Sequence, residues 1–176
     1  MDTMTNLLTR RSVKKYKSDP VPKELIDQIV QAGLCAASGL NKQAPIILAV
    51  TDKQVRDELS KLNAGKDPFF RADPFYNAPC VLVVLADKSV PTYVYDGSLV
   101  MGNLMHAANA LGLGACWIHR AKETFEMEEG KALLKKLGIE GEYEGIGNCI
   151  IGYPDGETPA FKPRPFRCPG AAASVR

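Results

Sequence analysis

Two polar runs in the first quarter of the chain carry residue types that suit a bound nucleotide-like cofactor. Residues 10–14 contain two arginines, a serine and a lysine, which offer cations and a hydroxyl to a phosphate. Residues 37–43 place serine, asparagine and glutamine side chains around Gly39, and such groups suit the edge of a planar heterocycle. Either run alone has a simpler explanation, since paired arginines are usually a solvated face and Ser-Gly-x-Asn is usually a turn. Together they predict a cofactor site.

The elements that must position these runs follow from the hydrophobic pattern. Short apolar runs predict four strands, at residues 46–50, 81–86, 115–118 and 146–153. Segments of helical period lie between them, around residues 25–32, 55–62, 97–111 and 123–137. The helix at 97–111 has little polar surface and is expected to be the most buried element. Early glutamates and late lysines favour one continuous helix over 123–137, which Gly138 ends.

Strands that alternate with helices predict an α+β sandwich, in which helices flank a sheet. A Rossmann site is disfavoured because no G-x-G-x-x-G follows a strand. At 176 residues and 45% hydrophobic composition, residues 1–176 are expected to form a single domain. Residues 155–176, rich in proline, glycine and alanine, are expected to form an extended C-terminal tail.

Composition narrows the function classes. A net charge of +2 is too small for a protein that binds nucleic acid over its whole surface. The five cysteines are odd in number and lack CxxC spacing, which favours reduced thiols over disulfides or metal ligands. The cysteine pattern thus predicts no metal site. The polar start and the absence of a long apolar run predict a cytoplasmic protein with no membrane span.

Five segments, in order, resemble one known family. Residues 8–16 are similar to an Arg-Arg-Ser-x-Arg/Lys-x-aromatic signature, and residues 36–43 to Ala-Pro-Ser-x-x-Asn-x-Gln-Pro. Ala78-Pro79 leads an apolar strand, residues 97–113 resemble a central helix ending in Ala-x-x-x-Gly-Leu-Gly, and residues 151–154 match Ile-Gly-Tyr/Phe-Pro. This order resembles the nitroreductase family of FMN-dependent oxidoreductases over nearly the whole chain, as a short member.

The resemblance implies an FMN site shared across a homodimer, with a mostly antiparallel central sheet and a C-terminal extension exchanged between subunits. The implied FMN-binding residues on the first run are Arg10, Arg11, Ser12 and Lys14. Arg10 and Ser12 would bind the phosphate together with Lys162 and Arg164, for which Arg167 is an alternative. Lys14 would act at the pyrimidine edge of the flavin, beside side-chain amides of the second run. The implied residues of the second run are Ala37, Ser38, Gly39, Asn41 and Gln43, most of them donated by the other subunit.

The third implied contact is a backbone N–H near flavin N5, in the stretch Trp117, Ile118, His119 and Arg120. His119-Arg120 replaces a Pro-x-Glu-Gly-like sequence of familiar members, and these two side chains would line the open face of the flavin with a catalytic role. The usual Asn-x-x-Lys before the second strand is absent, and Arg71 is a candidate to supply that cation. A nearby aromatic cluster is either a small lid or the packing of a proline-rich loop: Phe69, Phe70, Phe75 and Tyr76.

Three functions remain in competition at this point. The leading one is a ping-pong oxidoreductase that passes hydride from NAD(P)H through FMN to a small acceptor such as a nitroaromatic or quinone. The second is a non-catalytic flavin-binding protein, and the third an anion- or nucleic-acid-binding module built on residues 10–17. An absorbance spectrum separates the third from the other two, because only a flavoprotein is yellow.

Overall fold

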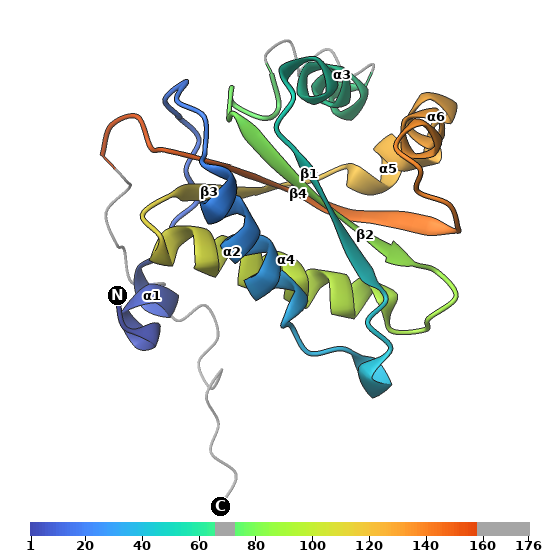
Figure 1. Ribbon diagram of the computed structural model, residues 1–176, viewed down its shortest axis with the longest axis horizontal. Coiled ribbons are helices and arrows are strands. Elements are labelled where there is room, and N and C mark those ends of the chain that lie inside the picture. The colour runs from blue at the N-terminus through green and yellow to red at the C-terminus, as the bar shows by residue number, and fades with distance from the viewer. Residues whose placement is uncertain (66–72, 158–176) are drawn as a thin grey trace, which may run out of the picture.

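The computed structural model describes residues 1–65 and 73–157 and is built around one antiparallel sheet (Figure 1). Its strands are β1 (Pro45–Val50), β2 (Cys80–Asp87), β3 (Gly114–Ile118) and β4 (Tyr143–Gly152). They lie in the order β1-β2-β4-β3, and every neighbouring pair is antiparallel. The four predicted strands and the predicted α+β class are therefore confirmed.

Helices cover both faces of this sheet (Figure 1). On one face lie α2 (Lys23–Leu34) and α4 (Tyr93–Ala110), with the short α1 (Thr3–Thr9) near the end of α4. On the other lie α3 (Lys53–Ala64), α5 (Ala121–Glu126) and α6 (Glu128–Lys136). A 3₁₀ turn, η1 (Gly39–Asn41), connects α2 to β1. Within residues 1–65 and 73–157, no helix has both the length and the hydropathy needed to cross a bilayer.

Strand β2 shows why the chain forms two cores. Val81, Val83 and Leu85 belong to the hydrophobic cluster under α3, α5 and α6, whereas Leu82 and Val84 belong to the cluster under α2 and α4. Successive side chains of a strand point to opposite faces, so an uninterrupted apolar run is what a strand buried on both faces requires. Burying these side chains stabilises the fold by about 1.5–3 kcal/mol each.

The prediction that the helix at 97–111 is the most buried element is wrong. Residues 80–86 of β2 are almost completely inaccessible, whereas α4 exposes 72% of Tyr95 and 51% of Leu99. The helix also begins earlier, at Tyr93. The apolar residues of α4 therefore lie on two faces of the helix, one packed on the sheet and one exposed at the surface of the chain.

The predicted continuous helix over residues 123–137 is two helices. Met127 has an extended backbone and separates α5 from α6. Gly130 then lies so close to the preceding helix that an added Cβ would be 1.9 Å from the carbonyl oxygen of Thr124. Glu128 and Glu129 thus fall in the first turn of a separate helix, where acidic side chains interact favourably with the helix dipole.

Candidate functional site

The segment from Ser12 to Lys14 runs along the sheet beside β3. Ser12 forms a parallel bridge with Ala115, and the Val13 amide donates to the carbonyl of Ala115 at 3.1 Å. Val13 is buried, whereas Ser12 and Lys14 are exposed. Because side chains alternate along an extended segment, Ser12 and Lys14 lie on the same, solvent-facing side.

A cavity of about 250 Å³ lies on this side. It is lined by residues 12–15 and 154–157. Backbone hydrogen bonds join the two segments, from the Lys17 amide to Tyr153 at 2.9 Å and from the Asp155 amide to Lys15 at 3.0 Å. The volume is slightly below that of sites enclosing a whole small molecule, so this pocket suits part of a cofactor.

Two lysines at the rim of this pocket differ in their partners. The ammonium of Lys15 is paired with the Asp155 carboxylate at 2.8 Å. Lys14 has no carboxylate partner among the described residues, and its Nζ lies 5.6 Å from the centroid of the Tyr76 ring. Lys14 therefore offers an uncompensated positive charge beside Ser12.

The two arginines of the run point in different directions. Arg11 donates through Nη1 to the carbonyls of Leu8 at 3.1 Å and Arg10 at 2.6 Å. Arg10 is half-buried, and its Nη1 is buried without an acceptor in the described part of the chain. Burial and the nearby Arg10 charge lower the pKa of His106 on α4. The Arg10 guanidinium thus lies near a neutral imidazole, and no carboxylate of the described residues pairs with it. It is therefore suited to an anion from outside the chain.

The second predicted run, residues 37–43, forms a strained turn. Leu40, Asn41 and Gln43 have φ of 50°, 54° and 51°, a region that non-glycine residues rarely adopt. The Gln43 amide donates to Ser38 Oγ at 3.1 Å, and Gln43 Nε2 donates to Asn41 Oδ1 at 3.0 Å. Ala37, Asn41 and Gln43 are exposed, so the turn presents amide groups outward.

Asp96, which the sequence analysis did not single out, fixes this turn to α4. Its buried carboxylate accepts from the Gly39 amide at 3.0 Å and from Thr92 Oγ1 at 2.9 Å. An added Cβ on Gly39 would lie 2.4 Å from Thr92 Oγ1, so the turn requires glycine there. A threonine four residues before an aspartate at a helix start was the available sequence signal.

The two predicted runs lie at opposite ends of α4 (Figure 1). The turn at residues 37–43 is bonded to Asp96 in the first turn of the helix. Residue Asn6, which leads into the arginine run, bonds to His106 and Asn109 near its end. Asp96 and His106 are ten positions apart, which is about 15 Å along the helix. Within one chain the two runs are therefore anchored at separate ends of this helix.

The third predicted stretch begins on β3 and leaves the sheet at its end. Trp117 and Ile118 are half-buried strand residues, and His119 is exposed. Arg120 has a left-handed backbone (φ 73°) and caps α5. Its guanidinium lies beside Gly65 at the end of α3, where an added Cβ would be 2.6 Å from Nη2. Residues 115–118 thus adjoin Ser12 and Lys14, while the Arg120 side chain extends toward α3.

Residues 73–77 form a turn that the sequence pattern did not predict, and this turn carries the Tyr76 ring that Lys14 contacts. The Asp73 carboxylate accepts from the backbone amides of Phe75 at 3.0 Å and Asn77 at 2.6 Å, and pairs with Arg56. Phe75 is fully buried and packs under the Arg56 guanidinium. The sequence signal was the cluster of turn formers in Asp-Pro-Phe-Tyr-Asn.

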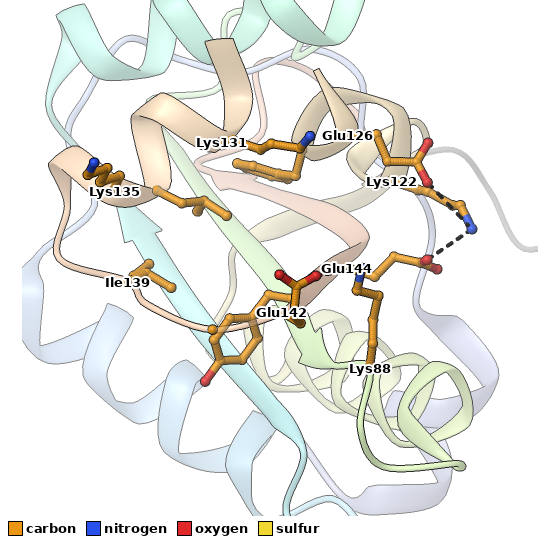
Figure 2. Close-up of a pocket in the computed structure, with 12 residues that line it drawn as sticks. Lys88, Lys122, Glu126, Lys131, Lys135, Ile139, Glu142 and Glu144 are labelled. Carbon is orange, nitrogen blue, oxygen red and sulfur yellow. Dashed lines mark ion pairs between the residues drawn. The ribbon is translucent and has the colours of Figure 1, made fainter. Parts of the chain in front are cut away.

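A second cavity, of about 380 Å³, lies away from both runs, between α5, α6 and the start of β4 (Figure 2). Its lining alternates lysines and glutamates. Lys88 is paired with Glu142 at 3.1 Å, and Lys122 lies between Glu126 and Glu144. Because three of its four lysines, Lys88, Lys122 and Lys131, are exposed and already paired with glutamates, the cavity is a poor phosphate site despite its size.

Three predicted residues lie outside the described residues, namely Lys162, Arg164 and Arg71. Their assignments remain predictions, as do the alternative Arg167 and the two readings of Phe69 and Phe70, as a small lid or as the packing of a proline-rich loop. The same holds for the C-terminal tail beyond residue 157.

Comparison with known proteins gives a consistent result. The chain resembles an FMN-dependent nitroreductase from Clostridium difficile R20291, with 30% identity, a TM-score of 0.76 and 92% of each chain covered. A nitroreductase with bound FMN from Bacteroides fragilis shares the fold at a TM-score of 0.87, with 22% identity over 100% of this chain and 99% of that one. An FMN reductase [NAD(P)H] from Bacillus subtilis is 27% identical over 180 residues, covering 93% of this chain and 70% of that protein. Another relative, 31% identical over 121 residues, is matched over only 60% of its own length.

The family model that matches is that of the nitroreductase family, over residues 7–153. This range includes both polar runs, all four strands and the whole of α4. The chain therefore belongs to the nitroreductase family.

Proposed function

We propose that this chain is an FMN-dependent oxidoreductase that takes hydride from NAD(P)H and passes it to a small organic acceptor, such as a nitroaromatic or a quinone. The observation that carries the proposal is the placement of Ser12 and Lys14 on one face of an extended segment beside β3, where Lys14 pairs with no carboxylate of residues 1–65 and 73–157. The FMN dependence of the Clostridium difficile relative and the NAD(P)H dependence of the Bacillus subtilis enzyme support it.

The residues present fit an anionic cofactor. Among the described residues, no acceptor faces the buried Nη1 of Arg10, and burying such a group is costly unless a partner compensates it. A phosphate held by Arg10 and Ser12 would provide that partner through charge-assisted hydrogen bonds. When bound, FMN supplies the ring that accepts and donates hydride.

Lys14 would then lie farther along the cofactor than Ser12. Its ammonium would place a positive charge near the pyrimidine edge of the ring, where reduction leaves negative charge. The half-buried Trp117 and Ile118 would exclude water from the neighbouring side of the ring.

The remaining amide contacts would come from a second copy of the chain, in a homodimer. Residues 37–43 are held at the start of α4, whereas the arginine run follows α1, which lies at the other end of this helix. The surface beside this turn is apolar, with Leu40 92% exposed, Tyr95 72% and Leu99 51%. A second subunit would cover these side chains and carry its own Ser12 and Lys14 to the turn.

Mixed dimers provide the first test. We expect Arg10→Ala and Asn41→Ala proteins to be impaired alone at limiting FMN, and to regain activity when unfolded and refolded together. In a mixed dimer one site receives both defects and the other receives none, so random pairing restores about a quarter of the parent activity. Mixing each variant with itself is the control. No recovery in the mixture, with mixed dimers demonstrated by mass, would place Arg10 and Asn41 in the same subunit's site.

Lys14→Met tests the charge at the ring. Loss of a cation that interacts better with the reduced cofactor should cost about 1–3 kcal/mol of reduction free energy. Because about 30 mV corresponds to 1.4 kcal/mol for a two-electron couple, the midpoint potential should fall by tens of millivolts while FMN stays bound. Lys15→Met is the matched control, since Asp155 already neutralises Lys15. A parent-like potential with loss of FMN would instead assign Lys14 to the phosphate.

The experiment that tests the cofactor assignment is extraction and identification of flavin from the purified protein. We expect about one FMN per chain. A non-catalytic flavin-binding protein, supported mainly by the unusual stretch from Trp117 to Arg120, would also contain FMN but would resist reduction by NAD(P)H.

A further inference from the structure

Tyr76 adopts a backbone conformation that its size makes unfavourable. Its φ is 52°, and that of the next residue, Asn77, is 57°. Positive φ is uncommon for non-glycine residues and a genuine outlier for a bulky one. Such conformations persist where surrounding contacts impose them, and they concentrate at functional sites.

The contacts that impose it converge on the Asp73 carboxylate. It accepts from the Phe75 amide at 3.0 Å, from the Asn77 amide at 2.6 Å and from Ser60 Oγ at 2.6 Å. The guanidinium of Arg56, a residue that is only 7% exposed, is paired with the same carboxylate. Both neighbours of Tyr76 are thereby anchored. The turn forces the ring of Tyr76 outward, where it is 37% exposed.

The outward ring meets the ammonium of Lys14. Nζ lies 5.6 Å from the ring centroid, within the range of a cation–π interaction. An aromatic ring holds a lysine in a different way from a carboxylate. The Asp155 carboxylate restrains Lys15 but also cancels its charge. The face of Tyr76 restrains Lys14 and leaves its net charge intact.

We propose that Tyr76 is a positioning residue for Lys14: it holds the ammonium toward the bound flavin without neutralising it. The inference rests on the proposed function, because the charge at stake is the one that forms on the flavin when it is reduced. Lysine is a flexible side chain with three donors, and ordering it before the reaction removes an entropy cost from the reduced state.

The first experiment uses the flavin-bound protein and measures its two-electron potential. In Tyr76→Leu the preference for reduced over oxidised flavin should fall about three- to tenfold, which is about 15–30 mV. Tyr76→Phe keeps the ring face and should retain the parent potential. FMN affinity should stay within about twofold of the parent in both variants, since the phosphate contacts are untouched.

A double-mutant cycle shows whether Tyr76 acts through Lys14. In the Lys14→Met background, Tyr76→Leu should lower the potential no further. The same fall in both backgrounds would overturn the inference, and so would a parent-like potential in Tyr76→Leu.

The second experiment uses flavin-free protein and reads the contact directly. The ε-methylene protons of Lys14 should be shifted upfield by the ring in the parent and in Tyr76→Phe, and not in Tyr76→Leu. Parent-like shifts in Tyr76→Leu would overturn the contact. If the parent holds no flavin, the proposed function fails and the role of Tyr76 fails with it. If flavin binds and is reduced but its potential ignores Tyr76→Leu, only the role of Tyr76 fails.

Discussion

Asp73→Ala is expected to lower the free energy of unfolding by about 3–5 kcal/mol, the largest effect among the changes considered, because it leaves the buried charge of Arg56 without its main partner. The side chains of Arg56 and Asp73 are only 9% and 18% exposed. Removing the carboxylate leaves the guanidinium buried beside Phe75 without its main partner, and it frees the amides of residues 75 and 77. Urea denaturation at neutral pH measures the loss.

Asp57→Ala is the matched control for this change. Asp57 also pairs with Arg56, at 3.0 Å, but its side chain is 37% exposed and it lies on the surface of α3. An exposed pair contributes about 1 kcal/mol or less. Equal losses in Asp57→Ala and Asp73→Ala would show that the turn at residues 73–77 contributes nothing special to stability.

The Asp73 contribution should also depend on pH. Partial burial raises the pKa of Asp73, but hydrogen bonds from Arg56, Ser60 and the turn amides outweigh it and hold the pKa below its usual range. A carboxyl whose pKa is lowered by folding stabilises the protein fully above its unfolded pKa of about 3.9 and loses this effect as the pH falls through the folded value. The difference between parent and Asp73→Ala should therefore be constant near neutrality and shrink below about pH 4.

The second large effect is expected for Arg10→Ala. Loss of a charge-assisted contact to the phosphate should weaken FMN binding by about 1.5–3 kcal/mol, or about 10- to 150-fold. Quenching of FMN fluorescence gives the affinity. Riboflavin lacks the phosphate, so its affinity should be nearly the same for Arg10→Ala and the parent.

Lys17→Ala serves as the charge-matched control, since it removes one exposed cation a few residues beyond the arginine run. It should change FMN affinity by less than about threefold at physiological salt, because exposed charges are screened. An Arg10→Ala protein that binds FMN as tightly as Lys17→Ala would remove Arg10 from the phosphate site.

The fold was predictable to the extent that it depends on local pattern. Strand β2 is an uninterrupted apolar run, and the family signatures fall at its start and on α4, so the sheet and the family could be inferred. The break at Met127 could not, because Gly130 is required by a contact with the backbone of α5, and helical periodicity does not register such a contact.

In the candidate site too, local features could be predicted from the sequence and tertiary contacts could not. Ser12 and Lys14 are two residues apart in an extended segment, so their common orientation follows from the sequence alone. The supports of the site join distant residues. Gly39 is hydrogen-bonded to Asp96, Asp73 is paired with Arg56, and Lys14 contacts the ring of Tyr76. The two residues of each pair are at least 17 positions apart in the sequence. Pairings of this kind depend on tertiary structure and leave no periodic signal.

The most direct test of the central claim is anaerobic titration of the purified, flavin-loaded protein with NADH and with NADPH, followed by absorbance. We expect the yellow oxidised spectrum to bleach with about one equivalent of at least one nicotinamide per flavin, and to return when a quinone or nitroaromatic acceptor is added. A stably yellow protein in excess of both nicotinamides, with FMN bound through Arg10 and Ser12, would contradict an oxidoreductase function for this chain.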